Sequence, residues 1–128
     1  LMNWAWEMPE GGAPFVEDPI EGARRELMEE AGLEAAHWLP AYKAEMSNSV
    51  TDERAMAWIA WGLTPVPIAP DPTEIIRVVR VPFAELLREI GTGAIRDMFT
   101  LATALRAYHM AREGELPPEL AKAMLAGV

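Results

Sequence analysis

Cysteine is absent from this chain of 128 residues. Without thiols the chain can form no disulfide framework, no cysteine nucleophile and no zinc or iron–sulfur site with cysteine ligands. Chains of this kind are typical of the reducing cytosol, so we expect a cytoplasmic location.

Basic residues are also scarce, with 11 lysines and arginines against 20 aspartates and glutamates and a formal net charge of -9. This charge repels phosphate backbones, so we expect no nucleic-acid partner. The longest apolar run, Ala55 to Leu63, is far shorter than the roughly 18 residues of a spanning helix. No basic segment followed by an apolar one marks a signal peptide. We therefore expect no membrane association.

The composition of the whole chain, with 51% hydrophobic and 24% charged residues, is that of a globular protein. The length predicts one domain over residues 1–128. Local patterns predict a short strand entering a glycine-rich loop at 9–14, and an irregular proline-rich loop at 64–72. They also predict a helix to about Ala31, strands at 37–45, 55–63 and 73–81, and helices at 83–90, 97–113 and after Pro118.

The first helix has clear start and stop signals. Asp18 is placed as its N-cap and Pro19 as its first residue, with Glu21 as the returning arm of a capping box. Gly32 stands where a left-handed residue would end it. Gly91, Gly93 and Gly114 are similarly expected to end the later helices.

Three glutamates on this helix are candidate ligands for a metal ion. Glu26, Glu29 and Glu30 have i, i+3 and i+4 spacing, which places three mutually repelling carboxylates on one face. A divalent cation between them explains such packing, and all-oxygen ligands favour Mg²⁺ or Mn²⁺. Arg25 is spaced to pair with Glu29 and fix its rotamer. A solvated acidic helix face is the simpler alternative, but it does not explain the fixed spacing.

Residues 11–33 complete the pattern Gly11-x5-Glu17-x7-Arg-Glu-Leu-x-Glu-Glu-x-Gly-Leu. This segment resembles the Nudix hydrolase box at every specified position. The flanking stretches 6–12, 71–78 and 93–97 resemble the branch that cleaves ADP-ribose and ADP-sugars. The resemblance implies an α/β Nudix fold, an α/β/α sandwich with a mixed sheet. It also implies Mg²⁺-dependent hydrolysis of a nucleoside diphosphate linked to another moiety. From ADP-ribose the products would be AMP and ribose 5-phosphate.

The resemblance also implies roles for individual residues. Glu26 and Glu30 match metal ligands, Glu29 matches a ligand or water-activating group, and the carbonyl of Glu10 matches a further ligand. Glu74 is the candidate general base. Asp71 is its alternative, because Pro72 stands where the branch often has a glutamate.

Further candidates concern the substrate. Glycines before the helix, Gly11 and Gly12, let backbone approach a phosphate or metal. Trp6 could stack a base, although most of the five tryptophans are expected to fill the core. Glu53 could approach the metal group.

Only ten residues precede Gly11, fewer than the branch usually has. We therefore expect N-terminal strands to be missing and a second copy to cover the exposed sheet, giving a homodimer. Two other functions stay open. The chain could be a Nudix hydrolase of nucleoside triphosphates or dinucleotide polyphosphates, or a non-catalytic Nudix-fold module that binds a nucleotide or a protein.

Overall fold

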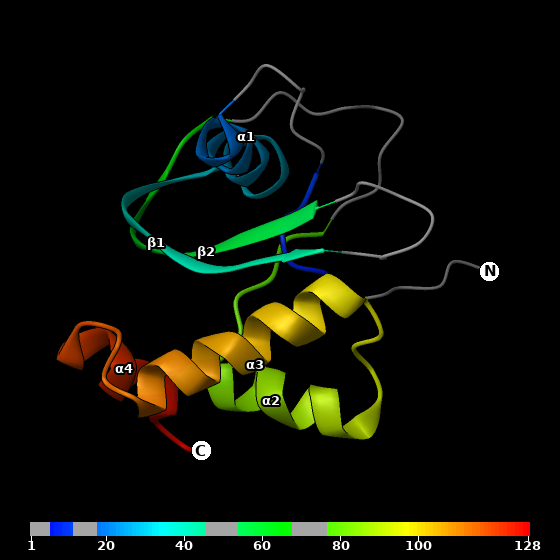
Figure 1. Cartoon of the computed structure of the whole chain (residues 1–128), viewed down its shortest axis with the longest axis vertical. Coiled ribbons are helices and arrows are strands. Elements are labelled where there is room, and N and C mark those ends of the chain that lie inside the picture. Colours follow the sequence, from blue (N-terminus) through cyan, green and yellow to red (C-terminus); the bar gives the residue numbers. More distant parts are fainter. Residues whose placement is uncertain (1–5, 12–17, 46–53, 68–76) are drawn as a thin grey trace.

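The computed structural model describes residues 6–11, 18–45, 54–67 and 77–128. Helix α1 and a π-helical turn, η1, precede two strands, and three further helices follow (Figure 1). The elements are α1 Pro19–Glu26, η1 Leu27–Ala31, β1 Leu33–Glu45, β2 Arg54–Pro65, α2 Phe83–Thr92, α3 Met98–Arg112 and α4 Pro118–Leu125. The predicted α/β class, the hairpin and all four helical regions are confirmed.

Helix α1 begins and ends where its signals predict. The Asp18 carboxylate accepts a 3.3 Å hydrogen bond from the Ile20 N–H, and Pro19 is the first helical residue. Gly32 adopts φ 66° and ends the helix. The Glu21 carboxylate is bound to Arg24 Nη1 at 2.7 Å, so the returning arm of the predicted capping box is engaged elsewhere.

The last turn of this helix is wider than the sequence predicts. Residues 27–31 form the π turn η1, which the Gly32 N–H closes by donating to the Leu27 carbonyl. Turns of this kind are rare and occur frequently at functional sites. This one carries Glu29 and Glu30, two of the three glutamates assigned to the chemistry.

Strands β1 and β2 form an antiparallel pair, from Leu33 opposite Pro65 to Glu45 opposite Arg54. The register shifts between Pro40 and Tyr42, where proline has no N–H to donate to the ladder. Both strands are longer than predicted. In particular, residues 64–65 belong to β2, although they were expected in the proline-rich loop.

Helices cover both faces of this hairpin. Figure 1 shows α1 on one face and α3, with α2 and α4, on the other. The core lies on the α3 side and is built from small and flexible residues: Ala41, Ala57, Met110, Ala111 and Leu116. None of the described helices is long and apolar enough to span a membrane.

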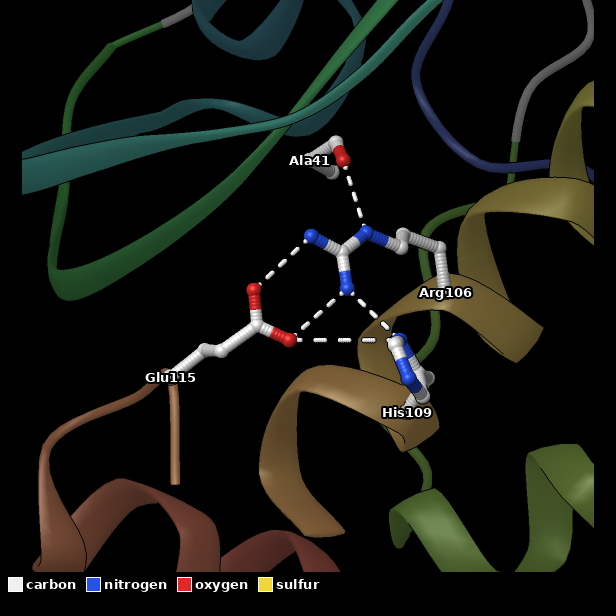
Figure 2. Close-up of polar contacts among 4 residues, drawn as sticks. All are labelled: Ala41, Arg106, His109 and Glu115. Carbon is white, nitrogen blue, oxygen red and sulfur yellow. Dashed lines mark hydrogen bonds and ion pairs between the residues drawn. The ribbon is translucent and has the colours of Figure 1, made fainter. Parts of the chain in front are cut away.

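Arg106 on α3 ties three elements together (Figure 2). Its Nε donates to the Ala41 carbonyl on β1 at 2.9 Å. Its two terminal nitrogens donate to both Glu115 oxygens, each at 2.9 Å. His109, one turn along α3, accepts from Arg106 Nη1 at 2.7 Å. This contact holds the α3–α4 connection against the sheet.

Several sequence-based expectations are wrong in the described residues. The short strand expected before the glycine-rich loop is not formed over 6–9. The strand predicted over 73–81 is not formed at 77–81, where Arg77, Val78, Val79 and Arg80 are exposed and irregular. Its β-branched residues have no strand beside them in the described sheet, which contains only β1 and β2. Helix α2 also continues through Gly91 and ends at Gly93, which has φ 83°.

Candidate functional site

The segment Trp6–Gly11 lies against the box helix, which consists of α1 and η1. It brings two of the predicted metal ligands to one place. The Glu10 backbone N–H donates to Glu30 Oε2 at 2.9 Å. The neighbouring Gly11 approaches Glu26 so closely that a Cβ there would lie 2.7 Å from Oε2 of Glu26 and nearer still to its other carboxylate atoms. Only glycine leaves room for this approach. Glu26 and Glu30 therefore converge on two consecutive backbone units.

The other predicted residues of the helix lie further out. Glu29 is exposed on the π turn. Arg25 is half-buried, and its Nη2 lies 3.8 Å from Glu26 Oε1. The predicted Arg25–Glu29 pair stays a prediction, while the observed ion pair brings Arg25 to another carboxylate of the same helix.

A second acidic group was missed by sequence analysis. Carboxylate oxygens of Glu7, Glu10 and Asp97 lie within 4.8 Å of one another. Burial, a hydrogen bond with Asp97 and the charges of Asp97, Glu7 and Glu30 raise the pKa of Glu10 to about 7. The family resemblance implied a role in metal binding only for the backbone carbonyl of Glu10. The fold also places its side-chain carboxylate next to those of Glu7 and Asp97. The spacing of Glu7 and Glu10 was visible, but nothing local linked them to Asp97.

The carboxylate oxygens of Glu7, Glu10 and Asp97 are suitable ligands for a hard divalent cation. Carboxylates crowd together, and Glu10 Oε2 is buried with no hydrogen-bond partner within the described part of the chain. Oxygen donors suit Mg²⁺ or Mn²⁺ better than a soft metal. Such an ion would offset the repulsion between the acids.

A cleft of about 350 Å³ separates the box helix from β1. Arg24 lies over the Trp38 ring there, 5.9 Å from its centroid. Arg25 lines the cleft as well as approaching Glu26. The full lining is Glu21, Arg24, Arg25, Met28, Glu34, Ala35 and Trp38.

The tryptophans within the described ranges are not among the buried core residues. The four that the structure describes, Trp6, Trp38, Trp58 and Trp61, are all partly exposed, so the expectation that most fill the core is wrong for them. Alanines fill the narrow space between α3 and the hairpin instead. Trp6 lies in the segment that contacts the box helix.

Several predicted positions lie outside the described residues: Gly12, Glu17, Glu53, Asp71, Pro72 and Glu74.

Comparison with known proteins identifies the family of the chain. A family model described as the NUDIX domain matches residues 2–102. The chain is 31% identical over 116 residues to the ADP-ribose pyrophosphatase of Mycobacterium tuberculosis (strain ATCC 25618 / H37Rv). That alignment covers 88% of this chain and 56% of the relative, so the chain spans little more than half the length of the protein it matches. Because the domain match covers most of the sequence and includes the box helix, the chain belongs to the Nudix family.

Proposed function

We propose that the chain catalyses Mg²⁺-dependent hydrolysis of the pyrophosphate bond in ADP-ribose or a related nucleoside diphosphate sugar. The products would be AMP and a sugar phosphate. Membership of the Nudix family supports pyrophosphate hydrolysis. The name of the mycobacterial relative, an ADP-ribose pyrophosphatase, supports ADP-ribose as the first substrate to test.

The observation that carries this proposal is the convergence of Glu26 and Glu30 on the backbone of Glu10 and Gly11. A merely solvated acidic face would not seat one carboxylate on a backbone N–H and another against a glycine. The convergence places carboxylate oxygens beside a backbone segment whose carbonyl oxygens are further possible metal ligands. That combination is what a magnesium site requires.

Each residue then has a proposed task. Glu26, Glu29, Glu30 and the carbonyl of Glu10 would hold the cation, and Arg25 would orient a carboxylate of this group. A cation held there would neutralise the pyrophosphate charge and help to activate water. Glu29 or Glu74 would accept the proton of the attacking water. Gly11, Gly12, Trp6 and Glu53 would contact the substrate.

We also propose that two copies of the chain associate. Val78 and Val79 are 51% and 56% exposed, and β1 and β2 pair only with each other in the described sheet. Apolar side chains and free strand edges favour burial against a partner. Light scattering of the purified chain at several concentrations tests this, and a monomer at all of them contradicts it.

Product analysis tests the enzymatic proposal. ADP-ribose, other nucleoside diphosphate sugars and nucleoside triphosphates are each incubated with Mg²⁺ and the chain. Glu30→Gln serves as the inactivated variant, and Glu119→Gln, an exposed residue of α4, as the matched control. We expect AMP and ribose 5-phosphate from ADP-ribose, their loss in Glu30→Gln and their retention in Glu119→Gln.

Two other outcomes would redirect the assignment. Turnover of nucleoside triphosphates alone would favour the other Nudix substrate class. A folded protein that is stabilised by Mg²⁺, as mass action requires for a bound ion, but cleaves nothing would contradict catalysis and favour a binding module.

A further inference from the structure

The Trp6–Gly11 segment has a second anchor besides the box helix, on α3. The Met8 backbone N–H donates to Thr100 Oγ1 at 3.0 Å, across 92 positions of sequence. Thr100 is only 4% exposed, so water cannot readily replace this hydrogen bond. The segment that bears Glu10 and Gly11 is therefore fixed at a second point, two residues before Glu10.

The Thr100 hydroxyl acts as donor and acceptor at once. It donates to Asp97 Oδ2 at 2.7 Å, and the same oxygen accepts from the Thr100 backbone N–H at 3.0 Å. With its one hydrogen committed to Asp97, the hydroxyl presents its lone pairs to the Met8 N–H. Valine, which has the same shape but no hydroxyl, can do neither.

Ionised acids at this contact would push the segment away from α3. Glu7 and Glu10 both bring carboxylate oxygens within 4.8 Å of those of Asp97, and like charges at this distance repel. A hydrogen bond between Glu10 and Asp97 requires a proton on one of the two acids. The bond from Met8 to Thr100 is a neutral attraction at the same contact that needs no such proton, so it also opposes displacement when the acids are ionised.

Displacement of Met8 would reach the box helix. Met8 and Glu10 are two residues apart, a span of at most about 7 Å of backbone. The Glu10 N–H donates to the Glu30 carboxylate, and a bond from backbone N–H to a charged oxygen is strong and directional. A shift of the segment would thus turn or release a carboxylate of the box.

We propose that Thr100 is a positioning residue for the box: its hydroxyl fixes the Trp6–Gly11 segment and, through the Glu10 N–H, holds Glu30 in the orientation that binds the divalent cation. The inference rests on the proposed function, because it concerns the cation that this function uses. Thr100 itself need touch neither the cation nor the substrate.

The test compares two buried threonines of the same helix. Thr103 lies one turn after Thr100 and is 9% exposed. Its hydroxyl is hydrogen-bonded to Tyr42 Oη on β1, at 3.1 Å, and not to the Trp6–Gly11 segment. Thr100→Val and Thr103→Val each replace a buried hydroxyl by a methyl group. Thr100→Ser restores the hydroxyl at the critical position. The dissociation constant for Mn²⁺ is measured on the whole chain by electron paramagnetic resonance of the free ion, together with the melting temperature in EDTA.

We expect Thr100→Val to raise the Mn²⁺ dissociation constant about 10-fold, in line with the loss of outer-shell partners at metal sites. Thr100→Ser is expected to bring it back, and Thr103→Val to leave it within about twofold of wild type at a similar melting temperature. An unchanged Mn²⁺ dissociation constant in folded Thr100→Val, or an equal rise of this constant in Thr103→Val, would overturn the positioning role. Neither result would contradict the proposed function.

The same experiment separates this inference from the proposed function. Tight Mn²⁺ binding by the wild-type chain without turnover of ADP-ribose contradicts the proposed function, while the effect of Thr100→Val on the ion still decides the positioning role. Failure of the wild-type chain to bind Mn²⁺ contradicts both.

Discussion

Gly11 presents a bare α-carbon to the carboxylate of Glu26, with no room for a side chain between them. Gly11→Ala should therefore move Glu26 or the segment, and we expect weaker Mg²⁺ binding together with a loss of hydrolysis of at least about 10-fold. Isothermal titration with Mg²⁺ and the product assay measure the two effects.

Gly91→Ala is the matched control for this substitution. Gly91 lies within α2, and a Cβ there would meet nothing within 4 Å. Alanine should stabilise the helix by about 0.5–1 kcal/mol and leave Mg²⁺ binding unchanged. Equal Mg²⁺ affinity in Gly11→Ala and Gly91→Ala would show that the close approach to Glu26 has no part in binding the ion.

The side chain of Glu10 predicts a pH dependence of stability. Its pKa is raised from 4.5 to about 7 by burial first and then by Asp97. The folded state therefore holds the proton more tightly than the unfolded state, and this contribution to stability is fully present below pH 4.5 and lost as the pH rises through 7. Glu10→Gln, which mimics the protonated form, should melt progressively higher than wild type between pH 5 and pH 8.

Thermal unfolding in EDTA checks this, since no bound ion then offsets the charges. Met98→Ala removes an exposed side chain that does not titrate, and its melting curve should run parallel to that of wild type over the same pH range. A constant difference between Glu10→Gln and wild type from pH 5 to pH 8 would rule out a raised pKa at this site.

Local signals accounted for much of the fold. Asp18, Pro19 and Gly32 specify the ends of the box helix through their own backbone preferences and short-range hydrogen bonds, which neighbouring residues alone determine. The π turn was not predictable in this way. It shares its apolar and acidic pattern with an ordinary α-helical turn.

Long-range relationships account for the rest. The box spacing predicted that Glu26 and Glu30 belong together, but not that the Glu10 N–H would hold Glu30. The approach of Asp97 to Glu10 depends on how α3 packs beside the segment, which no local pattern encodes. The strand expected over 73–81 is not formed at 77–81 for a similar reason: β-branched residues favour a strand only where a neighbouring strand accepts them.

The Arg106–Glu115 pair should stabilise the α3–α4 connection in a pH-dependent way (Figure 2). The hydrogen bonds from Arg106 hold the pKa of Glu115 below its usual value. This contribution is present above the ordinary glutamate pKa and is lost as the pH falls through the lowered one. Glu115→Gln should thus lower the melting temperature at pH 7, and the difference from wild type should shrink below about pH 4.5.

Arg106→Lys separates geometry from charge in this pair. Lysine keeps the positive charge but cannot donate to both Glu115 oxygens and the Ala41 carbonyl together, so the melting temperature should fall. The fall should be smaller in a Glu115→Gln background. Arg88→Lys, at an exposed position of α2, is the control. Additive effects of Arg106→Lys and Glu115→Gln would mean that the pair is not coupled.

Met110 should carry more of the stability than any exposed methionine, because it is 1% exposed among Ala41, Ala57 and Ala111. Its alanine neighbours cannot extend into the space that Met110→Ala would leave, so we expect a loss of about 2–5 kcal/mol in the free energy of unfolding. Met98, 69% exposed at the start of α3, should lose no more than about 0.5 kcal/mol on the same substitution. Urea unfolding of both variants measures this. Equal losses would mean that α3 does not pack on the hairpin through Met110.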